Sequence, residues 1–227
     1  MIETVILDLD DTLYDELDYC KSGFAAVAEH LAASPHAPAA DRIFQALWGQ
    51  FSAGNRKKTF NAALETLGIN HDDTLIRDLI RLYRNHTPKI SLSADARETI
   101  DLLSRKYHLA LLTDGFLPAQ ILKVKALGIE DYFQTIVYTE QLGREFWKPS
   151  PAGFEKILQT LNADPKSATY VADDELKDFI APNKLGMTTI RLIRPNHIHT
   201  DVSTDPNAKP HHKINQITDL PGLLDTL

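Results

Sequence analysis

Five short apolar segments, separated over much of the chain by stretches with helical periodicity, constrain the fold of this sequence most. The segments occupy residues 4–9, 108–113, 135–139, 168–173 and 188–193. Their length and the β-branched content of most of them are typical of buried strands. Between the later segments, apolar residues recur at helical spacing, as at Ile121, Val124 and Leu127. This alternation predicts an α/β fold with a doubly wound, mostly parallel, Rossmann-like sheet.

A long helical stretch interrupts the alternation just after the first predicted strand. Residues 16–90 contain four segments with helical periodicity and no clear strand. We therefore expect an all-helical domain over residues 16–90, inserted into a core formed by residues 1–15 and 91–227. At the end of the chain, residues 213–227 predict an edge strand and a short closing helix.

Composition narrows the class of protein. The 227 residues carry a formal net charge of −7, which gives no indication of a nucleic-acid or membrane-surface partner. Cys20 is the only cysteine, so an intrachain disulfide is excluded and a reducing compartment is compatible. The N-terminal residues lack a basic, apolar leader, and no apolar run reaches about 20 residues. We expect a cytoplasmic protein, and the sequence does not indicate its oligomeric state.

Acidic and polar side chains follow the predicted strands at their carboxyl ends. Asp8 and Asp10 follow the first strand, and Thr113 ends the second. The fourth ends at Asp173, with Asp178 five residues later. Since ligands of doubly wound sheets bind beyond the carboxyl ends of the strands, we expect all of these side chains on one rim.

This set of residues suggests phosphoryl chemistry. Carboxylates at a strand end require a cation, and all-oxygen ligands suit Mg²⁺, which usually shares its coordination with a phosphate. Thr113 and the backbone N–H groups of Asp114 and Gly115 are candidates to hold phosphate oxygens. Lys148, which lies in the loop before the fourth strand, would neutralise the remaining charge.

Two aspartates are the candidates for the covalent and proton-transfer steps. Asp8 is expected to attack phosphorus and form an aspartyl-phosphate. Asp10 is expected to protonate the leaving oxygen and later to deprotonate water. Arg144 is the nearest alternative to Lys148 for the cationic role.

The ordered motifs resemble those of the haloacid dehalogenase superfamily, in its phosphatase branch with a helical (type C1) cap. The matching residues are Asp8-Leu9-Asp10-Asp11-Thr12, Thr113, Lys148-Pro149, and Asp173 with Asp178. The resemblance implies a Mg²⁺-dependent hydrolase of phosphate monoesters acting on a small phosphorylated metabolite, of the sugar phosphate or nucleotide type. It also implies metal ligation by Asp8, Asp10 (through its backbone carbonyl), Asp173 and Asp178. The sequence departs from the family pattern at Ala172, where glycine is usual, and at Asp174 and Glu175, so metal ligation within residues 173–178 is open.

Three other activities share part of this pattern. A phosphosugar mutase would use the same aspartate pair and protect the phosphoenzyme from water. A hydrolytic dehalogenase is disfavoured, because that branch lacks an equivalent of Asp10 and of the metal site. A receiver-type signalling module also combines acidic residues, a threonine and a lysine, but its acceptor aspartate follows the third strand.

Two further groups of residues have open roles. Arg56, Lys57 and Lys58, in the segment between two predicted helices, are candidates for substrate specificity or a solvated face of the helical domain. Four histidines in the C-terminal part of the chain are weak candidates for a second metal site, because no cysteine or clear third ligand accompanies them. They lie at positions 197, 199, 211 and 212.

Overall fold

The computed structural model describes residues 1–196, 198 and 201–227 of the chain. The chain divides into two compact units. One unit comprises Met1–Leu17 and Ile90–Leu227, and the other comprises Asp18–Lys89. Among the described residues, no helix combines the length and the apolar character needed to cross a membrane.

The larger unit is built on a six-stranded parallel sheet with strand order β3-β2-β1-β4-β5-β6. The chain moves outward from β1 through β2 to β3 and then crosses back to β4 beside β1, so the order reverses at the β1–β4 pair. This arrangement confirms the prediction of a doubly wound, Rossmann-like α/β sheet. The strands are β1 (Thr4–Leu7), β2 (His108–Thr113), β3 (Thr135–Tyr138), β4 (Ala168–Ala172), β5 (Thr188–Leu192) and β6 (His212–Ile214).

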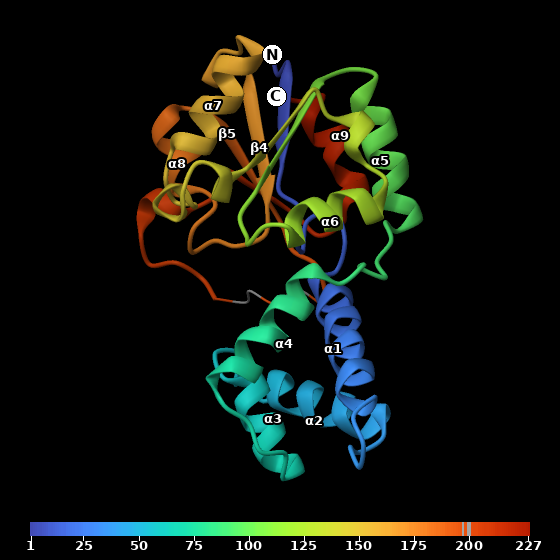
Figure 1. The fold of residues 1–227 in the computed structure, drawn as a ribbon. Helices are drawn as coiled ribbons and strands as arrows, with labels where there is room; N and C mark the ends of the chain where they lie inside the picture. The colour runs from blue at the N-terminus through green and yellow to red at the C-terminus, as the bar shows by residue number, and fades with distance from the viewer. Residues whose placement is uncertain (197, 199–200) are drawn as a thin grey trace. The chain divides into compact units, whose positions relative to one another are not determined.

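Helices cover both faces of this sheet. In Figure 1, α5, α6 and α9 lie on one face and α7 and α8 on the other. The helices are α5 (Ala94–Ser104), α6 (Ala119–Leu127), α7 (Ala152–Leu161), α8 (Ile180–Leu185) and α9 (Leu220–Leu224). Short 3₁₀ turns occupy Glu130–Tyr132, Thr139–Gln141, Arg144–Phe146, Pro165–Ser167, Pro206–Ala208 and Ile217–Asp219.

Coverage of both faces explains why the central strands are continuous apolar runs. All four residues of β1 are buried. Ile6 lies in register with Ala110 of β2 and Tyr170 of β4, so the three side chains share a face of the sheet. They belong to one core cluster with Phe154 and Ile157 of α7. This cluster packs α7 against the central strands and so stabilises the sheet whose strand ends carry the candidate site residues.

The smaller unit contains helices only. They are α1 (Glu16–Ala32), which begins in the larger unit, α2 (Ala40–Ser52), α3 (Thr59–Leu67) and α4 (Asp73–Asn85). Phe24 of α1 is its central aromatic side chain. The Phe24 ring centroid lies 5.5 Å from that of Phe51, 6.1 Å from that of Phe60 and 5.3 Å from that of Tyr83. One helix therefore contacts an aromatic ring from each of the other three, which gives this unit a core of its own.

A glycine permits the close approach of α1 and α4 in this core. A Cβ atom added at Gly23 of α1 would lie 2.4 Å from Cε2 of Tyr83 and 3.2 Å from the His86 ring. At Gly49, an exposed position of α2, an added Cβ would meet nothing within 4 Å. The two glycines therefore differ in their packing, whereas both lie within α-helices, where alanine is intrinsically favoured over glycine.

We expect Gly23→Ala to destabilise the protein and Gly49→Ala to stabilise it. Overpacking against Tyr83 costs about 1–3 kcal/mol, which outweighs the gain in helix propensity. At Gly49 only that gain of about 0.5–1 kcal/mol remains. Denaturant unfolding of both variants measures the difference. Equal stabilisation by the two substitutions would contradict the packing described for Gly23.

Candidate active site

The loop after β1 turns sharply and presents its aspartates in different directions. Asp8 still continues the sheet, because its N–H donates to the carbonyl of Val171 at 2.9 Å. Asp11 has a φ of 51°, in the left-handed region that Asp tolerates better than most residues. Its buried carboxylate accepts from the N–H of Glu16 at 2.8 Å and from that of Ile198 at 2.6 Å. Asp11 therefore stabilises the turn itself.

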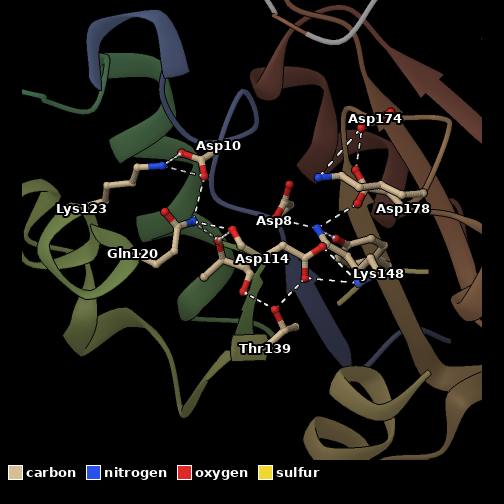
Figure 2. Close-up of polar contacts among 12 residues, drawn as sticks. Asp8, Asp10, Asp114, Gln120, Lys123, Thr139, Lys148, Asp174 and Asp178 are labelled. Carbon is tan, nitrogen blue, oxygen red and sulfur yellow. Dashed lines mark hydrogen bonds and ion pairs between the residues drawn. The ribbon is translucent and has the colours of Figure 1, made fainter. Parts of the chain in front are cut away.

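Lys148 lies at the centre of a buried charged cluster, shown in Figure 2. Its Nζ is 3.0 Å from Oδ1 of Asp8 and 2.8 Å from Oδ1 of Asp178. It also donates to the hydroxyl of Tyr170 at 2.9 Å, and its side chain is only 1% exposed. Burial opposes the charged ammonium, yet the carboxylates of Asp178 and Asp8 raise the pKa of Lys148 well above its usual value. The ammonium is therefore a fixed positive charge beside Asp8.

Three carboxylates of this cluster form a group suited to a cation. One oxygen from each of Asp8, Asp173 and Asp178 lies within 4.8 Å of the others. Oδ2 of Asp173 is buried and has no hydrogen-bond partner among the described residues. Burial, followed by the charges of Asp178 and Asp8, raises the pKa of Asp173 to about 9. Three buried carboxylates face one buried ammonium, and a divalent ion would offset the remaining negative charge. Hard oxygen donors are the ligands of Mg²⁺, so these residues fit the predicted ion.

Asp174 and Asp178 have different surroundings, which bears on the ligation that the sequence left open. The Asp174 carboxylate accepts from a backbone N–H two residues further on, at 3.0 Å. The N–H of Asp174 donates to Oδ2 of Asp178 at 2.9 Å, which leaves Oδ1 of Asp178 for the cluster. The backbone carbonyl of Asp173 accepts from Arg191 at 2.9 Å, and Arg191 pairs with the buried Glu175 at 2.6 Å. The turn therefore directs Asp178, and not Asp174, toward Asp8.

Asp10 lies apart from this group and contacts a second lysine. Its Oδ1 and Oδ2 are 2.8 and 2.9 Å from Nζ of Lys123. Oδ2 also accepts from Nε2 of Gln120 at 2.8 Å, and Oδ1 accepts from the hydroxyl of Tyr14. Burial favours the neutral carboxyl, but Lys123 and these hydrogen bonds lower the pKa of Asp10. Asp10 is therefore an anion held away from Asp8, and its predicted metal contact through the backbone carbonyl stays a prediction.

Thr113 is the last residue of β2 and is buried near Asp10. Its hydroxyl oxygen accepts from Nε2 of Gln120 at 2.6 Å. Gly115 follows with a φ of 141°, and a Cβ there would lie 2.7 Å from the side chain of Gln120. Only glycine therefore leaves room for Gln120 beside this loop. The proposed phosphate contacts of Thr113, Asp114 and Gly115 stay predictions.

Asp114 supports the loop that carries Lys148. Its carboxylate accepts from the hydroxyl of Thr139 at 2.8 Å and from the backbone N–H of Lys148 at 3.1 Å. Figure 2 shows these contacts linking the ends of β2 and β3 to Lys148. The side chain of Asp114 thus has a structural task in addition to the backbone role expected from the sequence.

A small pocket opens at this edge of the sheet. Its volume is about 180 Å³. Of the predicted catalytic residues, Asp8, Asp10 and Lys148 line the pocket and Thr113 does not. Trp147 is the one aromatic residue of the lining. The lining residues are Asp8, Asp10, Glu16, Asp114, Trp147, Lys148, Asp173 and Lys177. The strand ends that the sequence pointed to therefore surround one pocket.

The remaining candidates lie elsewhere or outside the described residues. Arg56, Lys57 and Lys58 are exposed in the segment between α2 and α3, and the Arg56 guanidinium lies 5.5 Å from the centre of the Phe51 ring. Nδ1 of His211 accepts from the N–H of Thr189 at 3.1 Å. His212 begins β6. Positions 197 and 199 lie outside the described residues, so a metal site at the four histidines stays a prediction.

Sequence reasoning missed the polar residues of α6. Gln120 and Lys123 are buried on the helix face that also carries Ala119, Val124 and Leu127. The available signal was polar residues three apart on a helix that otherwise buries apolar side chains. Spacing alone does not distinguish such residues from a solvated face, so their contact with Asp10 emerges only in three dimensions.

Comparison with known proteins decides the family. The model of the haloacid dehalogenase-like hydrolases matches residues 5–192. The chain belongs to this family. The resemblance inferred from the sequence motifs is thereby confirmed, and the protein is an enzyme of the haloacid dehalogenase-like hydrolases.

Curated relatives of this haloacid dehalogenase-like hydrolase are phosphatases. It is 25% identical over 217 residues to the glyceraldehyde 3-phosphate phosphatase of Methanopyrus kandleri. That alignment covers 92% of this chain and 91% of the relative. The chain is also 25% identical over 241 residues to the ribulose-1,5-bisphosphate 5-phosphatase of Halopiger xanaduensis, with 99% of each protein covered. Among solved structures, the magnesium-bound HAD-hydrolase YfnB of Bacillus subtilis has a TM-score of 0.69 at 21% identity, with 99% of each chain covered.

Proposed function

We propose that this protein is a Mg²⁺-dependent phosphatase that hydrolyses a small phosphorylated metabolite through an aspartyl-phosphate on Asp8. The observation that carries the proposal is the position of Asp8. Its carboxylate lines the pocket, with the Lys148 ammonium on one of its oxygens and Asp173 and Asp178 beside it. The phosphatase names of the relatives support the same activity.

Asp8, Asp173 and Asp178 would hold the ion with their side chains, and Asp10 with its backbone carbonyl. When bound, Mg²⁺ supplies positive charge that reduces repulsion between the nucleophile and the phosphoryl oxygens. Lys148 supplies a second positive charge from within the protein. It stabilises the Asp8 carboxylate and the developing charge on the transferring group.

The proposed reaction has two half-reactions. The Asp8 carboxylate attacks phosphorus, the bond from phosphorus to the leaving oxygen breaks, and Asp10 gives that oxygen a proton. Asp10 then takes a proton from water as the water attacks phosphorus, which releases inorganic phosphate and restores Asp8. Since Lys123 lowers the pKa of Asp10, the resting anion suits the second step, and the first requires Asp10 to carry a proton.

The pocket volume favours a small phosphoryl-binding site. Its volume of about 180 Å³ is below the roughly 300–1,000 Å³ typical of pockets for drug-sized ligands. The groups described above handle only the phosphoryl group, which every monoester shares. We propose that the helical unit acts as the cap and selects among substrates, with Arg56, Lys57 and Lys58 as its candidate contacts.

Mg²⁺ is expected to raise the Tm of the wild-type protein, because a ligand that binds only the folded state stabilises it. Asp173→Asn should abolish this shift. It should also raise the Tm of the metal-free protein near neutral pH, since it removes a carboxyl group whose raised pKa of about 9 disfavours folding above the unfolded-state pKa. Thermal unfolding with and without Mg²⁺ measures both effects. Asp174→Asn is the matched control, and it should keep the Mg²⁺ shift. An undiminished shift in Asp173→Asn would exclude this carboxylate from the site.

Hydrolysis of an aryl phosphate, followed by release of inorganic phosphate, should require Mg²⁺ and should be lost in Asp8→Asn. The amide is nearly isosteric but is not a nucleophile. Retention of the Tm close to the wild-type value would show that folding is not the cause of the loss. Full activity of Asp8→Asn, or full activity in a chelator, would refute the mechanism. Turnover of a phosphosugar isomer without release of phosphate would favour the mutase alternative.

The substrate-selecting role of the helical unit is tested with a screen of phosphorylated metabolites. For the substrate that it identifies, one of Arg56→Ala, Lys57→Ala and Lys58→Ala should lower kcat/KM by about 10-fold, or about 1.4 kcal/mol. The same variant should leave aryl phosphate hydrolysis nearly unchanged, because that substrate has no distal group. Wild-type behaviour of all three variants on both substrates would identify the three residues as a solvated face.

A further inference from the structure

Asp10 is held by donors from two separate parts of the chain. Lys123 and Gln120 belong to α6, and Tyr14 follows Asp10 in its own loop. In Figure 2, Lys123 reaches the carboxylate from the left and Gln120 reaches it from below. Both residues are buried, and the Lys123 side chain is 4% exposed against 18% for Asp10. Asp10 therefore contacts a buried donor group on one side while it lines the pocket.

The contacts of the Lys123 ammonium with carboxylates account for its burial. Burying a lysine is unfavourable unless the ammonium is paired. Its Nζ contacts both oxygens of Asp10 at 2.8 and 2.9 Å and lies 3.9 Å from Oε1 of Glu16. An apolar residue on this buried helix face would pack without such a cost. Asp10 lines the pocket, whereas Lys123 lies behind it and is not among the lining residues.

Gln120 connects the same carboxylate to the end of β2. Its Nε2 lies 2.8 Å from Oδ2 of Asp10, 2.6 Å from Oγ1 of Thr113 and 2.8 Å from the carbonyl of Asp114. The lack of a side chain at Gly115 leaves the space that this amide occupies. Gln120 and Lys123 are three residues apart, so they present their donors from adjacent turns of one helix. The orientation of Asp10 is thereby tied to that of Thr113.

We propose that Lys123, assisted by Gln120, is a positioning residue that holds the Asp10 carboxylate in the orientation from which it exchanges protons with the leaving oxygen and with water. This inference rests on the proposed phosphatase function. It assigns to α6 a task in turnover beyond covering the sheet. Because Lys123 acts through Asp10, its removal should lower kcat and leave KM for an aryl phosphate nearly unchanged.

The test compares Lys123→Met with Lys125→Met, which removes an exposed lysine from the same helix. Lys123→Met should lower kcat by about 10-fold or more, as expected when a proton-transfer group is poorly oriented. Lys125→Met should behave like the wild-type enzyme. Gln120→Leu, which removes a donor to the same carboxylate, provides a second variant with the same expected direction if Lys123→Met does not fold.

A double-mutant cycle separates positioning from a general loss of structure. In the Asp10→Asn background, Lys123→Met should cause no further loss beyond about twofold, because the carboxylate that it orients is already absent. A loss as large as in the wild-type background would overturn the proposal. A higher KM with unchanged kcat in Lys123→Met would also overturn the proposal, since it would assign Lys123 to substrate contact.

A crystal structure of metal-free Lys123→Met provides a measurement that does not depend on activity. The Asp10 carboxylate should move away from the position in which it accepts hydrogen bonds from Gln120 and Tyr14. An unchanged carboxylate position would refute the proposal whatever the kinetics. Loss of hydrolysis in Asp8→Asn, combined with independent effects of the Asp10 and Lys123 substitutions, would refute this inference alone. Full activity of Asp8→Asn would instead refute the proposed function, and the crystal structure would still decide whether Lys123 orients Asp10.

Discussion

The buried ammonium of Lys148 is the charge on which the arrangement of the strand ends depends. It lies between Asp8, at the end of β1, and Asp178, after β4, at 3.0 and 2.8 Å. Both carboxylates are buried, and a buried carboxylate is costly without a positive partner. The loop that carries Lys148 is in turn held by Asp114, whose carboxylate accepts from the backbone N–H of Lys148. One lysine thus connects the chain segments that follow β1, β2 and β4.

Two aspartates that are separated by a single residue have opposite environments. Burial raises the pKa of Asp8 to about 7 even beside Lys148. Burial also favours the neutral form of Asp10, but the charge of Lys123 and the hydrogen bonds from Lys123, Tyr14 and Gln120 together lower the pKa of Asp10. Pairs of titratable groups with diverging environments are typical of sites that divide nucleophilic and acid–base tasks. The division has a structural origin, because Asp8 pairs with Lys148 whereas Asp10 pairs with Lys123 of α6.

The long helical insertion between β1 and β2 is compatible with the sheet because the insertion has a core of its own. Phe24 contacts aromatic rings from α2, α3 and α4, so the insertion buries its own apolar surface. The β1 and β2 strands remain paired in register across the insertion, from Thr4 with His108 to Leu7 with Leu111. The insertion therefore has a core of its own and leaves the pairing of β1 with β2 intact.

The sequence by itself determined the fold class and the family. The strand and helix periodicities are local. The motifs at Asp8, Thr113 and Asp173 lie at strand ends that a parallel sheet brings to one edge, and Lys148 lies in a loop of the same unit. Only the tertiary structure decided which aspartate pairs with which lysine. The sequence did not distinguish Asp174 from Asp178, and it did not reveal Lys123 or Gln120, because their partners lie on other elements. Buried charges are paired by distance and orientation in space, and neither quantity is encoded in the spacing of residues along one strand or helix.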